Sequence, residues 1–130
     1  MKKMIIPALA LLMAAGMMSA GKKDDVMKKE NGVYVVNTTT IAKDVVGYEG
    51  PTPLKVYIKG NKIEKIEFLE NQETPRYWKR AAEFMLHKWD GMATKDVKTT
   101  QVDGCTGATY SSDAVKKNVQ AAVDYYIKNK

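Results

Sequence analysis

Residues 54–68 limit the possible folds more than any other part of the sequence, because two strand-like stretches flank the pair Gly60-Asn61. Residues 54–59 alternate apolar with polar or amphipathic side chains, and residues 62–68 continue in a less strict pattern. Glycine and asparagine both tolerate the positive φ that a two-residue hairpin turn requires. The sequence therefore predicts an antiparallel β-hairpin.

Residues 75–89 change from strand-like alternation to helical spacing. Thr74 suits the capping position before a helix, Pro75 suits its first residue, and Gly91 is a stop signal. This spacing predicts an amphipathic helix. We interpret His87 as a solvated residue on its polar side. The apolar face of this predicted helix contains Trp78, Ala82, Met85 and Trp89.

The C-terminal part of the chain predicts a second helix, again from the spacing of its apolar residues. Ser111 or Ser112 is a natural cap for it, and Asp113 suits the positive first turn. Its polar side contains mainly charged residues. Its apolar face contains Val115, Val119, Ala122, Val123 and Tyr126.

Three other segments complete the expected fold. Residues 32–40 are rich in β-branched side chains and predict a strand, and residues 97–102 predict another short strand. Residues 44–53 contain two glycines and two prolines and predict a loop or a bent edge strand. Together with the hairpin and the helices, these segments predict a single α+β domain with a mainly antiparallel β-sheet and two main helices.

Residues 1–21 have the order of a secretory signal peptide: a basic start, an uncharged apolar run over residues 4–18, and a small-residue segment. We predict cleavage near Ala20 or Gly21 and export to the periplasm or cell envelope. An uncleaved N-terminal anchor is the alternative, although the apolar run is short for a membrane span of about 20 residues. Residues 22–31 are polar and predict a flexible lead-in, which leaves residues 32–130 as the folded domain.

Composition excludes several classes of protein. One Cys and one His in 130 residues provide neither an internal disulfide nor the ligands of a typical zinc site. Lys and Arg number 21 against 15 Asp and Glu, and the excess is spread along the chain, so we predict no nucleic-acid partner. No set of nucleophile, base and orienting residue is visible, so we predict no catalytic centre. Cys105 is either a buried small residue or an exposed thiol able to form an intermolecular disulfide.

Residues 103–113 are rich in glycine and hydroxyl side chains and run directly into the second predicted helix. The start of a helix exposes backbone N–H groups and a dipole that favour an anion such as phosphate. Gly107 and Ala108 leave room for a bulky group to approach the backbone, and Lys116 or Lys117 is a candidate countercharge. These residues alone leave two interpretations open: a site for a phosphate-bearing ligand, or an ordinary capped helix after a glycine turn.

The segment Thr106-Gly107-Ala108-Thr109, followed by Tyr110-Ser111-Ser112, closely resembles the Ser/Thr-Gly-Ala-Thr motif of the FMN-binding domain family. That family includes flavin-carrying components of the sodium-pumping NADH:quinone reductase and of the Rnf complex, and small exported one-domain proteins. The resemblance implies that a flavin transferase attaches FMN to Thr109 through a phosphoester bond. Asp103 stands six residues before the acceptor, where the transferase's recognition pattern begins.

Three more motifs extend the resemblance over roughly residues 45–127. Residues 47–51 match the family's Gly-Tyr-x-Gly-Pro, Lys62-Ile63 matches the turn of its first hairpin, and Glu73-Thr74-Pro75 matches its Glu-Thr-Pro. The Glu-Thr-Pro motif lies near the flavin in the family. Arg76 departs from the family pattern, which commonly has glycine there. The residues expected to bind the cofactor are therefore Tyr48, Glu73, Thr74, Asp103, Thr106, Gly107, Ala108, Thr109, Tyr110, Ser111 and Ser112.

The resemblance thus implies an exported FMN-binding protein that transfers electrons and has no substrate-turnover site of its own. Its expected partners are FMN, a flavin transferase for maturation, and a membrane-bound electron donor or acceptor. Two alternatives remain. One is the same fold binding FMN without a covalent bond, and the other is a small exported interaction module without flavin.

Overall fold

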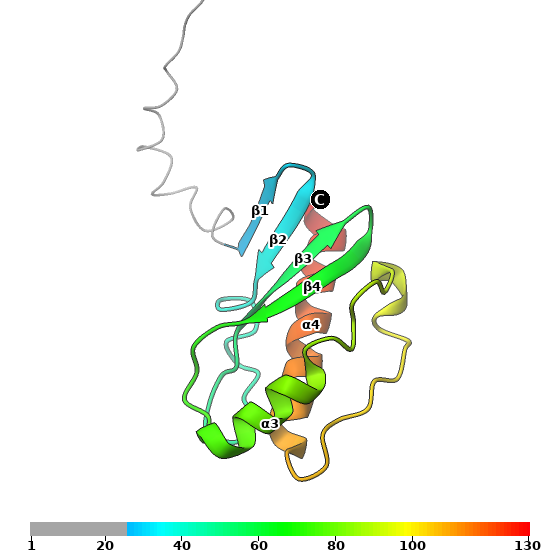
Figure 1. Cartoon of the computed structure of the whole chain (residues 1–130). Helices are drawn as coiled ribbons and strands as arrows, with labels where there is room; N and C mark the ends of the chain where they lie inside the picture. Colours follow the sequence, from blue (N-terminus) through cyan, green and yellow to red (C-terminus); the bar gives the residue numbers. More distant parts are fainter. Residues whose placement is uncertain (1–25) are drawn as a thin grey trace, which may run out of the picture.

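The computed structural model describes residues 26–130 (Figure 1). The predicted signal peptide, its cleavage site and the first part of the lead-in lie outside these residues. In the described part, four strands form one antiparallel sheet in the order β1-β2-β3-β4. The strands are β1 (Met27–Glu30), β2 (Val33–Asn37), β3 (Leu54–Lys59) and β4 (Lys62–Phe68). The helices are α3 (Pro75–Met85) and α4 (Thr109–Asn129), with a short 3₁₀ turn, η1 (Thr94–Asp96), between them.

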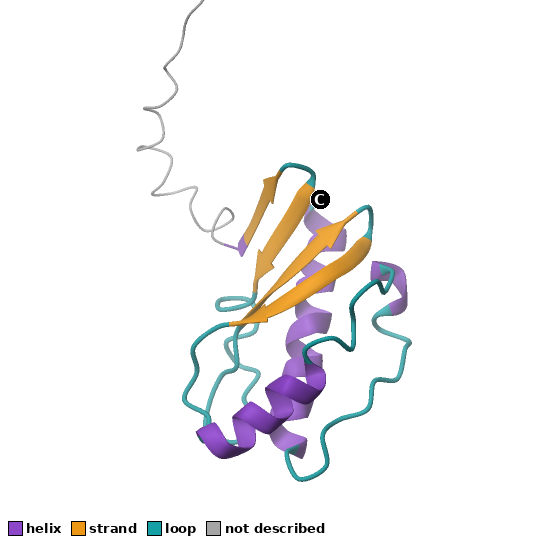
Figure 2. Ribbon diagram, in the orientation of Figure 1, coloured by secondary structure: helices purple, strands orange, loops and turns teal. Residues whose placement is uncertain are grey.

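The α+β fold predicted from the sequence is confirmed, as a single domain with an antiparallel sheet and two helices. Figure 2 shows α4 running behind the sheet, with α3 near the N-terminal end of α4. The loops after β2 and β4 extend to that same end of the molecule. No helix within residues 26–130 combines the length and apolarity that crossing a bilayer requires.

The predicted hairpin is present as β3 and β4. Gly60 and Asn61 have φ values of 59° and 61°, as a two-residue turn of this kind requires. The less strict pattern of β4 has a physical reason, because the pairing shifts by one residue between Tyr57 and Ile58. Such a bulge places one extra residue in β4, so Ile63 and Ile66 both face the core although they are three positions apart.

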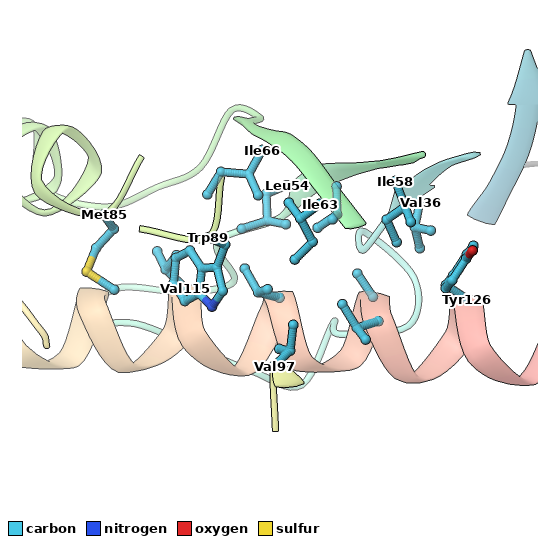
Figure 3. Close-up of a cluster of buried hydrophobic side chains, with 14 of the residues drawn as sticks. Val36, Leu54, Ile58, Ile63, Ile66, Met85, Trp89, Val97, Val115 and Tyr126 are labelled. Atoms are coloured by element: carbon cyan, nitrogen blue, oxygen red, sulfur yellow. The ribbon is translucent and has the colours of Figure 1, made fainter. Parts of the chain in front are cut away.

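The core lies between the sheet and α4. All five residues of the predicted apolar face of α4 are at most 3% exposed. They pack against side chains from β2, β3 and β4. Met85 and Trp89 complete the core near the N-terminal end of α4 (Figure 3). The sheet residues in this core are Val36, Leu54, Val56, Ile58, Ile63 and Ile66.

Helix α3 confirms the first predicted helix in part. Thr74 holds the capping position and Pro75 begins the helix, but the Thr74 side chain makes no capping hydrogen bond. The helix ends at Met85 rather than Trp89, and residues 86–91 form turns that finish at Gly91, whose φ is +83°. Trp89 still reaches the core from this turn.

Two predictions of local structure are wrong. Met27–Glu30 is strand β1 rather than part of a flexible lead-in, because Asn31 and Gly32 form a positive-φ turn that folds it onto β2. Residues 97–102 are not a strand. The edge of β4 instead pairs with the chain at Ala93, and Val97 is buried against the core from the turn after η1.

Candidate functional site

Helix α4 begins at Thr109, the last residue of the Thr-Gly-Ala-Thr segment. Its capping position is Ala108, which has no side chain able to cap, and the first turn contains no acidic residue. The first backbone N–H groups of a helix lack intrahelical partners. The N–H groups at the start of α4 are therefore available to an anion, and the helix dipole favours one there.

The four threonines and serines of residues 106–112 separate into two pairs. Ser111 and Ser112 are only 2% and 0% exposed, whereas Thr106 and Thr109 are exposed. The Ser112 hydroxyl oxygen accepts the backbone N–H of Cys105 at 2.9 Å. The prediction that Ser111 or Ser112 caps the helix is wrong, because α4 begins two residues earlier and both serines lie inside its first turn.

A cavity of about 400 Å³ opens beside Thr109. Small-molecule sites in proteins commonly have volumes of about 300–1,000 Å³. The rings of Tyr48 and Tyr110 stand at its walls, with centroids 6.1 Å apart and planes at 36°. Both tyrosines are more than 60% exposed, and neighbouring exposed aromatic side chains of this kind mark a binding surface. The residues that line the cavity are Tyr48, Tyr77, Gly107, Ala108, Thr109, Tyr110 and Ser111.

Tyr77 of α3 is a lining residue that the sequence analysis did not identify. It lies outside the apolar face of α3 and is 41% exposed, so it has no place in the core. The sequence did contain a signal for Tyr77, because it is an aromatic residue on the polar side of an amphipathic helix. The guanidinium of Arg76, the residue that departs from the family pattern, lies 5.6 Å from the centre of the Tyr77 ring. This cation–π contact occupies the place where the family commonly has only glycine.

Glu73 is buried, at 6% exposure, and does not line the cavity. Its carboxylate accepts the backbone N–H groups of Tyr48, Glu49 and Gly50 at 2.8, 2.6 and 3.0 Å. It also accepts the Ser111 hydroxyl at 2.8 Å. Burial by itself would raise the pKa of Glu73, but these four hydrogen bonds outweigh it and lower the pKa below its ordinary value. Glu73 is therefore ionised at neutral pH and joins two segments of the chain.

The glycines of the site are explained by close approaches. A Cβ at Gly47 would lie 2.5 Å from a Glu73 carboxylate oxygen, so only glycine fits there. Gly107 has a φ of +87°, and a Cβ there would lie 2.9 Å from Nη1 of Arg80. Arg80 of α3 thus lies beside the glycine turn that leads into α4. The sequence alone does not indicate this position, because a cation on the polar side of an amphipathic helix looks the same as a solvated one.

The remaining candidates are Asp103, Thr74 and the predicted countercharges. Asp103 is exposed in the loop before α4, and Thr74 is half-buried at the start of α3. Neither of them lines the cavity. Lys116, one of the two predicted countercharges, lies 3.9 Å from the carboxylate of Asp113. Within residues 26–130, no group of three potential metal ligands occurs.

Cys105 is buried, at 6% exposure, in a small cluster with Ala81 and Ala108. Of the two alternatives left open by the sequence, the structure therefore selects the buried small residue. The cluster holds the motif segment against α3. His87 is on the surface, as predicted, with its Nδ1 atom 2.8 Å from Asp90.

A sequence model of the FMN-binding domain family matches residues 47–124. The match covers more than half of the chain, from the loop with Tyr48 to the body of α4, and the chain therefore belongs to the FMN-binding domain family. FMN is accordingly its cofactor. No curated protein sequence matches the chain.

The site fits this cofactor on its own geometry. FMN consists of a planar aromatic ring system and a phosphate joined by a ribityl chain. The open N–H groups of α4 and the nearby Arg80 suit the phosphate, and the cavity lined by three tyrosines suits the ring system. Thr109, which is exposed, belongs to both parts of the site, because it begins α4 and also lines the cavity.

Proposed function

We propose that this protein is an exported flavoprotein that carries electrons, with FMN joined to the Thr109 hydroxyl by a phosphoester bond. One observation carries the proposal: Thr109 is an exposed hydroxyl residue that lines the cavity at the first residue of α4. Ser111 and Ser112 are buried and hydrogen-bonded, and Thr106 does not line the cavity.

The chain's own residues have distinct roles in this proposal. The first N–H groups of α4 bind the phosphate oxygens, and Arg80 offsets their charge. Tyr48, Tyr77 and Tyr110 surround the ring system and orient it. The FMN, when bound, supplies the electron-transfer chemistry. A flavin transferase would complete the protein, and a membrane-bound donor or acceptor would exchange electrons with it.

The test uses the full chain, produced with its N-terminal segment in a host that contains an active flavin transferase. We expect the native protein to be yellow and its band on a denaturing gel to fluoresce, because a phosphoester bond survives denaturation. The same chain from a host without the transferase is the control and should give a dark band. A yellow native protein with a dark band would show non-covalent binding, and a colourless protein would contradict flavin binding altogether.

An Arg80→Gln variant tests the phosphate side of the site. We expect FMN to bind about two- to fivefold more weakly, which is the range for an exposed charge pair. The loss should fade in high salt, because salt screens exposed charges. The measurement is a titration that follows quenching of FMN fluorescence, made in a Thr109→Val background so that all binding is reversible.

The matched control for Arg80→Gln is Lys79→Gln, which removes an exposed positive charge from the neighbouring position of α3. We expect its affinity for FMN to equal that of the parent. Equal affinities for all three proteins at low salt would contradict a role of Arg80 at the phosphate.

A further inference from the structure

We infer that Glu73 and Ser111 form a clamp that fixes the two tyrosine walls of the cavity relative to each other, so that both are positioning residues for the flavin ring. This inference rests on the proposed function for the identity of the ligand. The clamp itself rests on hydrogen bonds between segments that are far apart in the sequence. Resemblance to the family had implied instead that both residues bind the cofactor, with Glu73 near the flavin.

The first half of the clamp holds the loop that contains Tyr48. Residues 46–51 form a tight turn, in which Val46 pairs with Pro51 and the N–H of Gly47 donates to the carbonyl of Gly50 at 2.8 Å. Three successive N–H groups of this turn, from residues 48–50, converge on the Glu73 carboxylate. Such a concave row of N–H groups favours an anion. The buried charge of Glu73 therefore determines the shape of this turn and the direction of Tyr48.

The second half of the clamp holds the start of α4. The Ser111 hydroxyl donates to Oε1 of Glu73, the same oxygen that accepts the N–H of Tyr48. A serine hydroxyl has a single proton to donate. Because that proton is used here, Ser111 does not donate to a phosphate. Its neighbour Tyr110 also lines the cavity, next to the Tyr48 ring, so this one bond links the position of Tyr110 to that of Tyr48.

The chemistry of the clamp requires a carboxylate. Four donors point at Glu73, and an ionised carboxylate accepts hydrogen bonds at both oxygens. Glutamine would turn its N–H₂ group towards either the N–H of Tyr48 or the N–H groups of Glu49 and Gly50, and in both cases backbone donors would face a donor. Replacing Glu73 by Gln therefore breaks part of the clamp, although the side chain keeps its size.

The experiment compares Ser111→Ala and Glu73→Gln with the wild type and with Glu70→Gln. Glu70→Gln is the matched control, because Glu70 is an exposed carboxylate three residues earlier. The first readout is amide hydrogen exchange at Tyr48, Glu49 and Gly50 in the flavin-free proteins. We expect exchange to be about tenfold faster in Ser111→Ala, as for the loss of one hydrogen bond, and faster still in Glu73→Gln.

The second readout is the visible circular dichroism of the bound flavin, which reports how rigidly the ring is held. At equal covalent loading on Thr109, we expect this signal to fall by about half or more in both variants and to stay unchanged in Glu70→Gln. A weaker flavin signal at unchanged covalent loading would show that the residue positions the ring and does not bind the phosphate. Far-UV circular dichroism checks that each variant is folded. If Glu73→Gln does not fold, Ser111→Ala still decides the test.

Wild-type exchange rates and flavin signals in Ser111→Ala would overturn the clamp. If the variants lose covalent loading but keep the exchange rates, Ser111 serves the attachment and the inference is likewise wrong. A wild-type protein that takes up no flavin would overturn the proposed function instead. In that case the exchange rates alone would decide whether the clamp joins the two segments.

Discussion

A Thr109→Val variant, produced beside an active flavin transferase, is expected to give a completely dark band on a denaturing gel. Valine has nearly the size and shape of threonine but no oxygen to accept a phosphoester bond. Thr109 is exposed at the first residue of α4, where the substitution disturbs neither the core nor a capping bond. The loss of fluorescence would therefore report the missing hydroxyl and not a missing fold.

The matched control is Thr100→Val, which removes an exposed threonine hydroxyl from the loop before the transferase's recognition pattern. Its band should stay fluorescent, because Thr100 lies outside that pattern and does not line the cavity. A fluorescent Thr109→Val band would refute Thr109 as the acceptor. A dark band from a Thr106→Val variant beside a fluorescent Thr109→Val band would move the attachment to Thr106.

An Asn118→Ala variant is expected to lose about 2–4 kcal/mol of folding free energy, as for the destruction of a buried polar network. Asn118 lies on α4 with 0% exposure. Its amide oxygen accepts the Thr38 hydroxyl, and its amide nitrogen donates to Thr52 at 3.2 Å and to the carbonyl of Ala114 at 2.9 Å. Thr38 also accepts the N–H of Leu54 at 2.9 Å. Alanine would leave two buried threonine hydroxyls without their partner.

The measurement for Asn118→Ala is thermal unfolding of the flavin-free protein, followed by far-UV circular dichroism. A domain of this size should lose about 10 °C or more in Tm, since each kcal/mol corresponds to roughly 4–8 °C. Gln120→Ala is the control, because Gln120 lies on the exposed side of the same helix and should change Tm by very little. A Tm of Asn118→Ala within a few degrees of the wild type would show that the network adds no net stability.

The parts of the fold that were predictable from the sequence are those fixed by local periodicity. The hairpin over residues 54–68 and the apolar face of α4 follow from spacings of two and of three or four residues. Strand β1 was missed because its sequence, Met-Lys-Lys-Glu, has little strand preference, although Asn31-Gly32 was a turn signal. The predicted strand over residues 97–102 had the right residue types, but the segment that pairs with the edge of β4 is the earlier one at Ala93.

The candidate site divides in the same way. The segment from Thr106 to Thr109 and the start of α4 are contiguous in the sequence, so a motif could indicate them. The bonds from Glu73 to residues 48–50 and to Ser111 span between 23 and 38 positions, and only the folded chain brings these groups together. Arg80 and Tyr77 reach the site from α3 for the same reason. Their positions depend on how α3 packs against α4, which no local pattern specifies.

The exposure of the two wall tyrosines has a consequence for how a cofactor stays in place. A protein can retain a small molecule by surrounding it or by bonding to it. With Tyr48 63% and Tyr110 68% exposed, the walls of this cavity stand open to water and cannot enclose a ring system on all sides. If FMN is bonded to Thr109 as proposed, that bond keeps the cofactor in place while the edge of the flavin stays uncovered. A redox partner could then approach that edge directly, without any lid having to open first.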